Sequence, residues 1–273
     1  MGIITALGGI LAYGSTAQSS VRRFTINKPR EAIPWSATGA FGMKSQLAGN
    51  TDWSGSASIY GYIPGTLPGE AFTFNGQTDS SGGGTKWTGA AIMESITVTT
   101  DTEAAAPIQT DLTFRGNGAL STGTGTVADS ANPGIYSSIS LGVTFDGSAV
   151  TAVRGWTLNI QNDLQQYCTD GDAGIIKRKA GNLSGGGSFT VYEGAPASVL
   201  TPGAVAVMWL HVTGSLYWEL TYAQIVDFTK EVPIEDAGII PVTYNFVFTG
   251  HKLITATWTR GSLKKPDTTK FWS

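Results

Sequence analysis

The sequence has few of the residues on which most enzymatic and metal sites depend. Cysteine occurs once, at Cys168, and histidine twice, at His211 and His251. A single cysteine forms no intrachain disulfide, so the composition suits a reducing compartment. Two histidines, each in or beside an alternating pattern, favour structural roles over a metal site. Neither lies near Cys168 in sequence, which favours an inert thiol over a nucleophile.

Charge is also scarce. The chain has 17 basic and 20 acidic residues, a net charge of −3, and charged residues make up only 14% of it. A general nucleic-acid binder needs a basic excess or a basic face to neutralise phosphates, so this balance argues against one. The apolar opening, Met1 to Tyr13, lacks the basic start of a signal peptide and is too short to span a bilayer. We therefore expect an ordered arm or edge strand there, and no membrane insertion.

Motifs that carry catalysis are missing as well. The sequence contains no Gly-x-Ser-x-Gly elbow, no phosphate loop and no dinucleotide-binding fingerprint. Asp170 and Asp172 stand one residue apart in "TDGDAG", but the third oxygen donor and the distant glutamate of a calcium loop are absent. A polar turn is the better interpretation. The sequence predicts no cofactor, no metal and no catalytic residue, and an enzyme is the weakest of the function classes considered.

Glycine, with 36 residues, and abundant threonine, valine, serine and aromatic residues predict short strands joined by turns. We expect a mainly β chain with little helix. In "VRGWTLNIQND" apolar and polar residues alternate, which places the apolar ones on a buried face. Short helical turns are an alternative to strands at residues 90–96 and 221–228. The expected sheet core is Phe24, Ile26, Trp156, Leu158, Ile160, Phe114, Phe246 and Phe248.

The sequence repeats itself. "VRRFTINKPRE" begins at Val21 and the similar "VRGWTLNIQND" at Val153, an offset of 153 − 21 = 132 residues. "AGNTDWSGSASIYGY" from Ala48 and "AGNLSGGGSFTVYEG" from Ala180 keep this offset. After an insertion of two residues near 197–201, the final strands, which start at Pro107 and Pro241, match at 134. We therefore predict a duplication, with one domain at 1–130 and a second at 131–273.

The only dense basic cluster is "KRK", and its surroundings supply the candidate contacts between subunits. The cluster is either a solvated loop or a contact to acidic groups on a neighbouring subunit. The corresponding place in the first half has a single lysine. The candidate subunit or ring contacts are Lys177, Arg178, Lys179, Lys44, Asp170 and Asp172.

The order of motifs in the second half resembles that of tail tube proteins of long-tailed bacteriophages. These motifs are "VRGWTLNIQNDL", a loop with "KRK", "SGGGSFTVYEG" and "EVPIEDAGIIPVTYNFVFTG". The resemblance covers residues 153–250 and, through the repeat, 21–116. Its motifs are soft patterns without invariant catalytic residues. The family usually has a helix after the Gly-Ser strand, whereas "GAPASVLTPGA" (194–204) is short and broken by proline.

The resemblance implies two tandem homologous β-sandwich or β-barrel domains of the tail tube type. Three such chains would form a homotrimeric ring with pseudo-six-fold symmetry, and stacked rings would form the tube through which phage DNA passes. The loops at 43–52 and 166–182 and the arm at 1–20 are the expected stacking contacts between rings. The implied partners are further copies of the chain, other tail proteins and DNA in transient, non-specific passage. The implied location is the virion tail, after assembly in the host bacterial cytoplasm. Candidates for the lumen or the outer surface are Thr25, Asn27, Thr157, Asn159 and Gln161.

Two other functions stay open at this point. A tail terminator or baseplate ring protein would use the same fold to cap a tube instead of extending it. A carbohydrate-binding or adhesive β-sandwich is the second, because eight tryptophans and nine tyrosines could stack on sugars.

Overall fold

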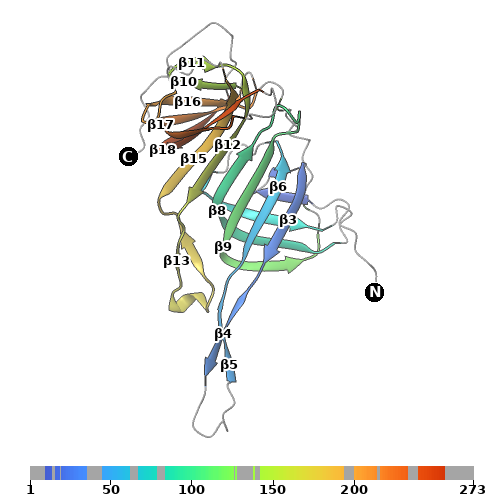
Figure 1. The fold of residues 1–273 in the computed structure, drawn as a ribbon. Helices are drawn as coiled ribbons and strands as arrows, with labels where there is room; N and C mark the ends of the chain where they lie inside the picture. The colour runs from blue at the N-terminus through green and yellow to red at the C-terminus, as the bar shows by residue number, and fades with distance from the viewer. Residues whose placement is uncertain are drawn as a thin grey trace.

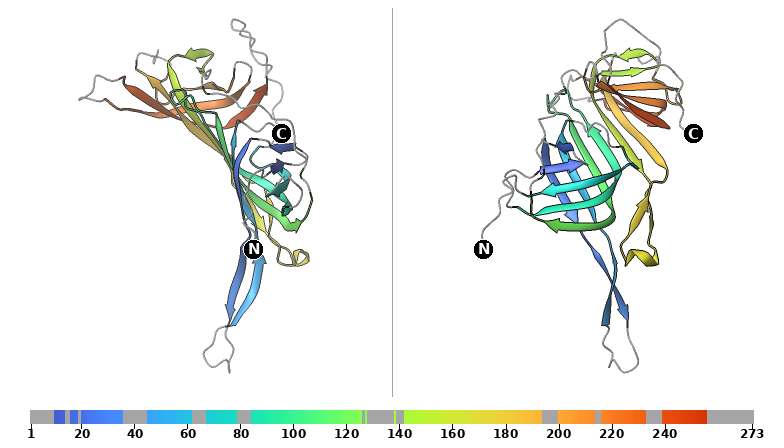
Figure 2. Two further views of the ribbon diagram at one scale, coloured as in Figure 1. Left: turned by 90° about the vertical axis from the view of Figure 1, so that its right-hand side faces the viewer. Right: turned by 180° about the vertical axis from the view of Figure 1, so that it is seen from behind.

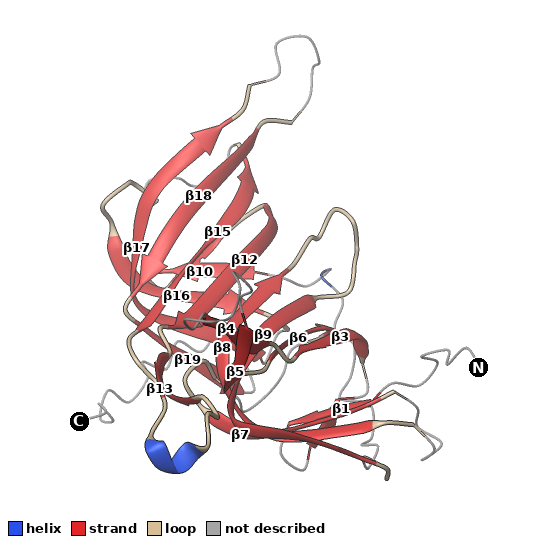
Figure 3. Ribbon diagram, turned by 90° about the horizontal axis from the view of Figure 1, so that it is seen from below, coloured by secondary structure: helices blue, strands red, loops and turns tan. Residues whose placement is uncertain are grey.

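The structure is a computed structural model that describes residues 10–13, 16–18, 20–35, 45–61, 67–78, 84–125, 127, 138, 142–193, 200–213, 216–232 and 239–255. Within these residues the chain is mainly β, as its composition predicts. One large antiparallel sheet of 15 strands runs through both halves of the chain (Figure 1). The described helical residues are the single turn η2 (Asp170–Asp172), the large blue turn in Figure 3, and Ser138. None of the described helical residues forms a helix that could cross a membrane.

The strands of the two halves pair in the same order. The first half follows the order β3 (Val21–Asn27), β6 (Ser54–Tyr60), β9 (Gln109–Gly123), β8 (Lys86–Thr99), β7 (Ala71–Gln77), β1 (Ile10–Tyr13) and β2 (Thr16–Gln18). The second follows β12 (Val153–Asn162), β15 (Leu183–Tyr192), β18 (Pro241–Phe248), β17 (Leu216–Lys230), β16 (Val205–His211), β10 (Gly142–Phe145) and β11 (Ser148–Val150). β19 (Gly250–Thr255) continues the line of β18 along β17.

Each half also sends out a hairpin between its first two strands. The first consists of β4 (Arg30–Trp35) and β5 (Ser45–Thr51), and the second of β13 (Gln165–Tyr167) and β14 (Lys177–Lys179). Both leave the sheet in the same general direction, downward in Figure 1. The β4–β5 hairpin extends much further from the body of the molecule (Figure 2).

The strand register corrects one expected offset. The step from β3 to β12 is 153 − 21 = 132 residues, and that from β7 to β16 is 205 − 71 = 134, as the sequence predicts. For the final strands, however, Gln109 lies opposite Tyr60 and Pro241 opposite Tyr192, which gives 241 − 109 = 132 and not 134. Because side chains alternate with a period of two, both offsets place the same residues on the buried face, and only the pairing distinguishes them.

The helical alternative at residues 90–96 and 221–228 is wrong, because these segments lie within β8 and β17. Each strand contains a bulge, one between Met93 and Ser95 and one between Ile225 and Asp227. An extra residue shifts the alternation, so that the apolar spacing changes from two to three at the bulge. This spacing imitates a helical pattern.

The core lies between two layers in each half. In the first half β7, β1 and β2 fold over one face of β3, β6 and β9 (Figure 2). The ring of Phe74 on β7 lies 5.6 Å from that of Trp53 and 5.0 Å from that of Phe114. The Trp53 indole N–H donates to the Gly118 carbonyl at 2.9 Å, so its polar atom is satisfied.

The structure places the expected core residues on one face of the main sheet. Phe24 and Ile26 are only half-buried because β3 is an edge strand, although both pack against the core. The other six are at most 6% exposed: Trp156, Leu158, Ile160, Phe114, Phe246 and Phe248. Glycines make room for the largest rings, since a Cβ on Gly55 would lie 2.4 Å from Phe114 and a Cβ on Gly187 would lie 2.7 Å from Phe246.

Candidate assembly interface

Two strand segments at opposite sides of the main sheet have an edge without a partner strand. Among the described residues, β3 pairs only with β6, and the end of β17, from Asp227 to Lys230, pairs only with β18. An unpaired edge presents a row of backbone N–H and C=O groups, which makes it a template for another strand. The eight strands between these edges follow the order β3-β6-β9-β8-β12-β15-β18-β17.

The junction between the halves shows how such edges pair. β12 lies antiparallel to the end of β8, with Thr157 opposite Thr99 and Gln161 opposite Ser95. β9 occupies the other side of β8, as β18 occupies the other side of β17. β12 is the repeat counterpart of β3, and the end of β8 is that of the end of β17. The two free edges are therefore the counterparts of two strands that pair with each other inside the chain.

Applied to the free edges, the offset of 132 gives a definite register. Thr157 and Thr99 correspond to residues 157 − 132 = 25 and 99 + 132 = 231. In the same way, Asn159 opposite Thr97 corresponds to Asn27 opposite Thr229. No other part of the described chain fills either edge, so in a single chain this pairing stays unmade.

Burial differs between the paired edge and the free edge. Ile96, next to β12, is 3% exposed, whereas its counterpart Phe228 (96 + 132 = 228) is 51% exposed. The ring of Phe228 contacts Tyr244 on one side, with 5.9 Å between centroids. The apolar face of the sheet therefore continues to the free edge and stops there uncovered.

The face of the main sheet opposite the core is polar. Across three neighbouring strands, Thr157 lies opposite Ser188 and Ser188 opposite Asn245. The exposed or half-exposed positions of β12 on this face are Thr157, Asn159 and Gln161. Thr25 and Asn27 occupy the corresponding positions of β3. The second layers cover the opposite face, so these hydroxyl and amide groups point away from the core.

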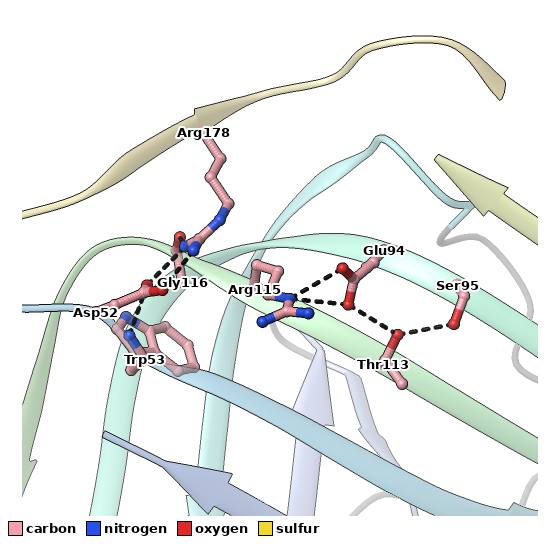
Figure 4. A network of polar contacts seen from close by, with 8 residues as sticks. All are labelled: Asp52, Trp53, Glu94, Ser95, Thr113, Arg115, Gly116 and Arg178. Carbon is pink, nitrogen blue, oxygen red and sulfur yellow. Dashed lines mark hydrogen bonds and ion pairs between the residues drawn. The ribbon is translucent and has the colours of Figure 1, made fainter. Parts of the chain in front are cut away.

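An ion pair joins the two halves at the base of the hairpins (Figure 4). Arg178 on β14 donates to both carboxylate oxygens of Asp52, at 2.7 and 2.5 Å, and to the Gly116 carbonyl at 2.6 Å. The Arg178 side chain is 5% exposed and that of Asp52 22%. Burial raises the pKa of the Asp52 carboxyl, but the bonds and charge of Arg178 and the Trp53 amide outweigh it, so the pKa lies below 3.8.

Backbone bonds reinforce this contact. The Thr51 amide donates to the Gly174 carbonyl at 2.7 Å, and the Ile176 amide donates back to the Thr51 carbonyl at 3.2 Å. The Arg178 amide donates to the Asn117 side chain at 2.7 Å. The β13–β14 hairpin is thereby fixed against β5 and β9 of the first half.

A second polar network lies on the uncovered face of β8 and β9 (Figure 4). Arg115 donates from Nε to both oxygens of Glu94 at 2.9 Å, and Glu94 accepts from Thr113 at 3.2 Å. This network borders an open hollow of about 490 Å³ at the junction with β12. Its lining is polar throughout, without an aromatic ring on which a sugar could stack: Glu94, Ser95, Thr113, Gln161, Asn162, Asp163 and Ser184.

The residues singled out around "KRK" have separate places in the structure. Lys177 forms an ion pair with Asp172, whose pKa falls to about 2 through hydrogen bonds from Lys177 and then Thr169. Asp170 and Lys179 are exposed. Arg178 forms its ion pair with Asp52 of the same chain, and Lys44 lies outside the described residues. A contact to a neighbouring subunit stays a prediction for this group.

The sequence patterns did not identify Asp52, although Asp52 accepts the hydrogen bonds that Arg178 donates. A comparison of the two repeats could have indicated the pair, because both charged residues have uncharged counterparts. These are Gln46 for Arg178 (178 − 132 = 46) and Ser184 for Asp52 (52 + 132 = 184). The ion pair thus joins the two halves within the chain, and its counterpart residues, Gln46 and Ser184, carry no charge. No three or more histidine, cysteine, aspartate or glutamate side chains of the described ranges cluster as metal ligands would. The chain matches no known family model and no curated protein.

Proposed function

We propose that this chain is a tail tube protein of a long-tailed bacteriophage, with two tandem tube domains, and that three chains form each ring. The observation that carries the proposal is the pair of free edges at β3 and β17. They are repeat counterparts of strands that already pair at the β8–β12 junction. Head-to-tail pairing of these edges leaves no free edge only if the chain of subunits closes on itself.

The size of the sheet favours a conduit. Three chains contribute three times the eight strands of the main sheet. Barrels of about 16–18 strands already enclose an aqueous channel, so a closed barrel of this size is hollow. The second layers cover the outer face, which leaves the polar face with Thr157, Asn159 and Gln161 toward the lumen. This face carries mainly hydroxyl and amide groups, and Glu94 balances the charge of Arg115 on it, so it binds DNA phosphates less than unpaired lysines and arginines would.

Electron microscopy and native mass spectrometry of the purified protein test the proposal. We expect rings of three chains, or hollow tubes built from them. A terminator or baseplate ring would give closed rings that never extend, which is the second candidate within the same particle. A protein that stays monomeric at every concentration would overturn both.

A designed cross-link tests the register itself. Asn27→Cys with Thr229→Cys, in a Cys168→Ser background, places one thiol on each free edge at positions that correspond to Asn159 and Thr97. Oxidation should give covalent dimers and trimers but no covalent species larger than three chains within one ring. The matched control shifts one thiol to the other face, with Ile26→Cys and Thr229→Cys, and should cross-link poorly.

A further inference from the structure

The strand edges that pair inside the chain are almost uncharged. Residues 153–162 of β12 include one charged residue, Arg154, and residues 95–99 of β8 include none. Arg154 forms its ion pair with Glu103, which lies beyond the end of β8. The junction between the halves is therefore made by backbone pairing and uncharged side chains over the length of the two strands.

The free edges, in contrast, are charged and opposite in sign. The counterparts of the two paired segments are residues 21–30 and 227–231. The first contains no acidic residue and four basic ones, Arg22, Arg23, Lys28 and Arg30. The second contains Asp227, Lys230 and Glu231, and Lys230 forms an ion pair with Glu193 of the same chain. One free edge is thus basic and the other acidic.

Arg23 and Glu231 have no charged partner in the single chain. Both are exposed, and neither forms an ion pair with another residue that the structure describes. The neighbouring Arg22 differs, because it lies over the ring of Tyr60 and donates to Gln109 of its own chain. One unpaired charge of each sign therefore stands on the two free edges.

The register of the proposed ring brings these two charges together. Glu231 corresponds to Thr99 and Thr25 to Thr157, so Glu231 of one chain lies opposite Thr25 of the next. Arg23 and Thr25 share the polar face of β3, since they pair with Ser58 and Ser56 and side chains alternate along a strand. Arg23 is then a diagonal neighbour of Glu231, at a separation of about 7–8 Å that long side chains span.

The residue that corresponds to Arg23 shows why the contact between chains has room for side chains. This residue is Gly155 (23 + 132 = 155), and a Cβ on it would lie 2.5 Å from the Thr100 carbonyl oxygen. The backbone after Thr99 thus runs close against β12. Arg23 has a Cβ, so the backbone after Glu231 cannot approach β3 as closely, and side chains fill the space instead.

We propose that Arg23 of one chain and Glu231 of the next form an ion pair across the contact between chains, and that the opposite charges of the two edges select head-to-tail pairing. This inference rests on the proposed ring. A free edge can also pair with a second copy of itself, which gives a closed dimer instead of a ring. Two basic edges repel each other, so the charges disfavour the dimer and favour the ring.

Charge reversal tests the ion pair. Arg23→Glu and Glu231→Arg each replace an attraction by a repulsion at all three junctions of a ring. In either variant the concentration at which half of the chains are trimeric should rise about tenfold at low salt, and less at high salt. The double variant, Arg23→Glu with Glu231→Arg, restores the attraction with exchanged charges and should recover the original concentration. Native mass spectrometry over a dilution series measures the trimer.

A matched control and a mixing experiment sharpen the test. Lys179→Glu makes the same change of charge at an exposed residue outside both free edges, and it should form trimers as the unaltered protein does. When the two single variants are mixed, unlike chains attract at two of the three junctions of a mixed ring. Mixed trimers should then exceed the roughly threefold excess over pure trimers that random combination gives. Urea denaturation of the monomers should be unchanged in every variant.

The outcomes separate this inference from the proposed function. Trimers that form equally well in all variants would overturn the ion pair and leave the ring intact. A double variant that assembles no better than the single variants would also overturn it, because both residues would then act separately. Dimers of the unaltered protein that never extend to trimers would overturn the selection and the ring together. A protein that stays monomeric would overturn the proposed function, and the ion pair with it.

Discussion

Arg178 donates hydrogen bonds to both carboxylate oxygens of Asp52, and the two residues lie 126 positions apart in the sequence. The contact fixes a hairpin of the second half against the first half, at the junction where β8 and β12 pair. Because the repeat replaces these residues by Gln46 and Ser184, a junction between chains of the proposed ring would have strand pairing without this ion pair. The two kinds of junction in a ring would therefore differ in strength and in chemistry.

Removal of the Asp52 charge should destabilise the chain. Asp52→Asn keeps the shape but leaves the buried Arg178 without a counter-charge, and we expect a loss of about 2–4 kcal/mol in unfolding free energy. Urea denaturation measures it. Glu103→Gln is the control, because it breaks the exposed Arg154–Glu103 pair and should cost less than about 1 kcal/mol. Equal losses of unfolding free energy in the two variants would show that the buried ion pair stabilises the chain no more than the exposed one does.

Gly55 and Gly187 should not tolerate a side chain. A Cβ on Gly55 would lie 2.8 Å from the Thr25 carbonyl oxygen, and one on Gly187 would lie 2.0 Å from that of Thr157. We expect Gly187→Ala to lower the melting temperature and to cost about 1–3 kcal/mol through backbone displacement. Gly123→Ala, where nothing lies within 4 Å of the added atom, is the control and should leave stability nearly unchanged.

The strand type, the buried face and the repeat could be predicted from alternation and composition. Trp156, Leu158 and Ile160 follow period two without interruption, and all three are buried. The bulges at Glu94 and Val226 could not be predicted, because one extra residue makes the apolar spacing of β8 and β17 resemble that of a helix. The offset of the final strand could not be predicted from the sequence either, because a shift of two residues leaves each side chain on the same face of the sheet.

The candidate interface was less accessible to prediction than the fold. A free edge is defined by the absence of a partner, and partners in this sheet are far apart in sequence, as β8 and β12 are. The basic cluster has the composition of an exposed loop, yet Arg178 is buried and paired with Asp52. Asp52 is a single acidic residue, and no sequence motif around it indicates this pairing. Long-range pairing, and not local sequence, decides both.

Stability should fall as the pH drops from 7 toward 5. Burial lowers the pKa of His211 and His251 below 6.5, so the folded chain binds these protons less readily than the unfolded chain does. As the pH falls through 6.5, the unfolded chain takes up these protons before the folded chain does, so protonation favours unfolding until the lowered pKa values are passed. Both ring nitrogens of His251 are buried without a hydrogen-bond partner. His251→Leu, which removes the two unpaired ring nitrogens, should raise stability and flatten this dependence in urea titrations at several pH values.

A second acid-dependent loss should follow at lower pH. Hydrogen bonds from Lys177 and Thr169 hold the pKa of Asp172 at about 2, below its usual 3.8. A depressed pKa adds stability above pH 4, and this contribution is lost as the pH falls toward 2. Asp172→Asn should remove that part of the titration while leaving the histidine-dependent part between pH 7 and 5 unchanged. A variant whose whole profile shifts would place the effect elsewhere.

Phe228 offers a way to separate folding from ring closure. It is 51% exposed in the single chain, so Phe228→Ser should cost no more than about 1 kcal/mol of unfolding free energy. In a closed ring the same residue would lie beside β3 of the next chain, as Ile96 lies beside β12, and its loss should prevent trimer formation. Native mass spectrometry measures the oligomer and urea denaturation the fold. Ile96→Ser is the contrasting change, because Ile96 is already 3% exposed within the chain and its replacement should destabilise the monomer. A Phe228→Ser protein that is stable and still trimeric would mean that the free edge of β17 is not the contact between chains.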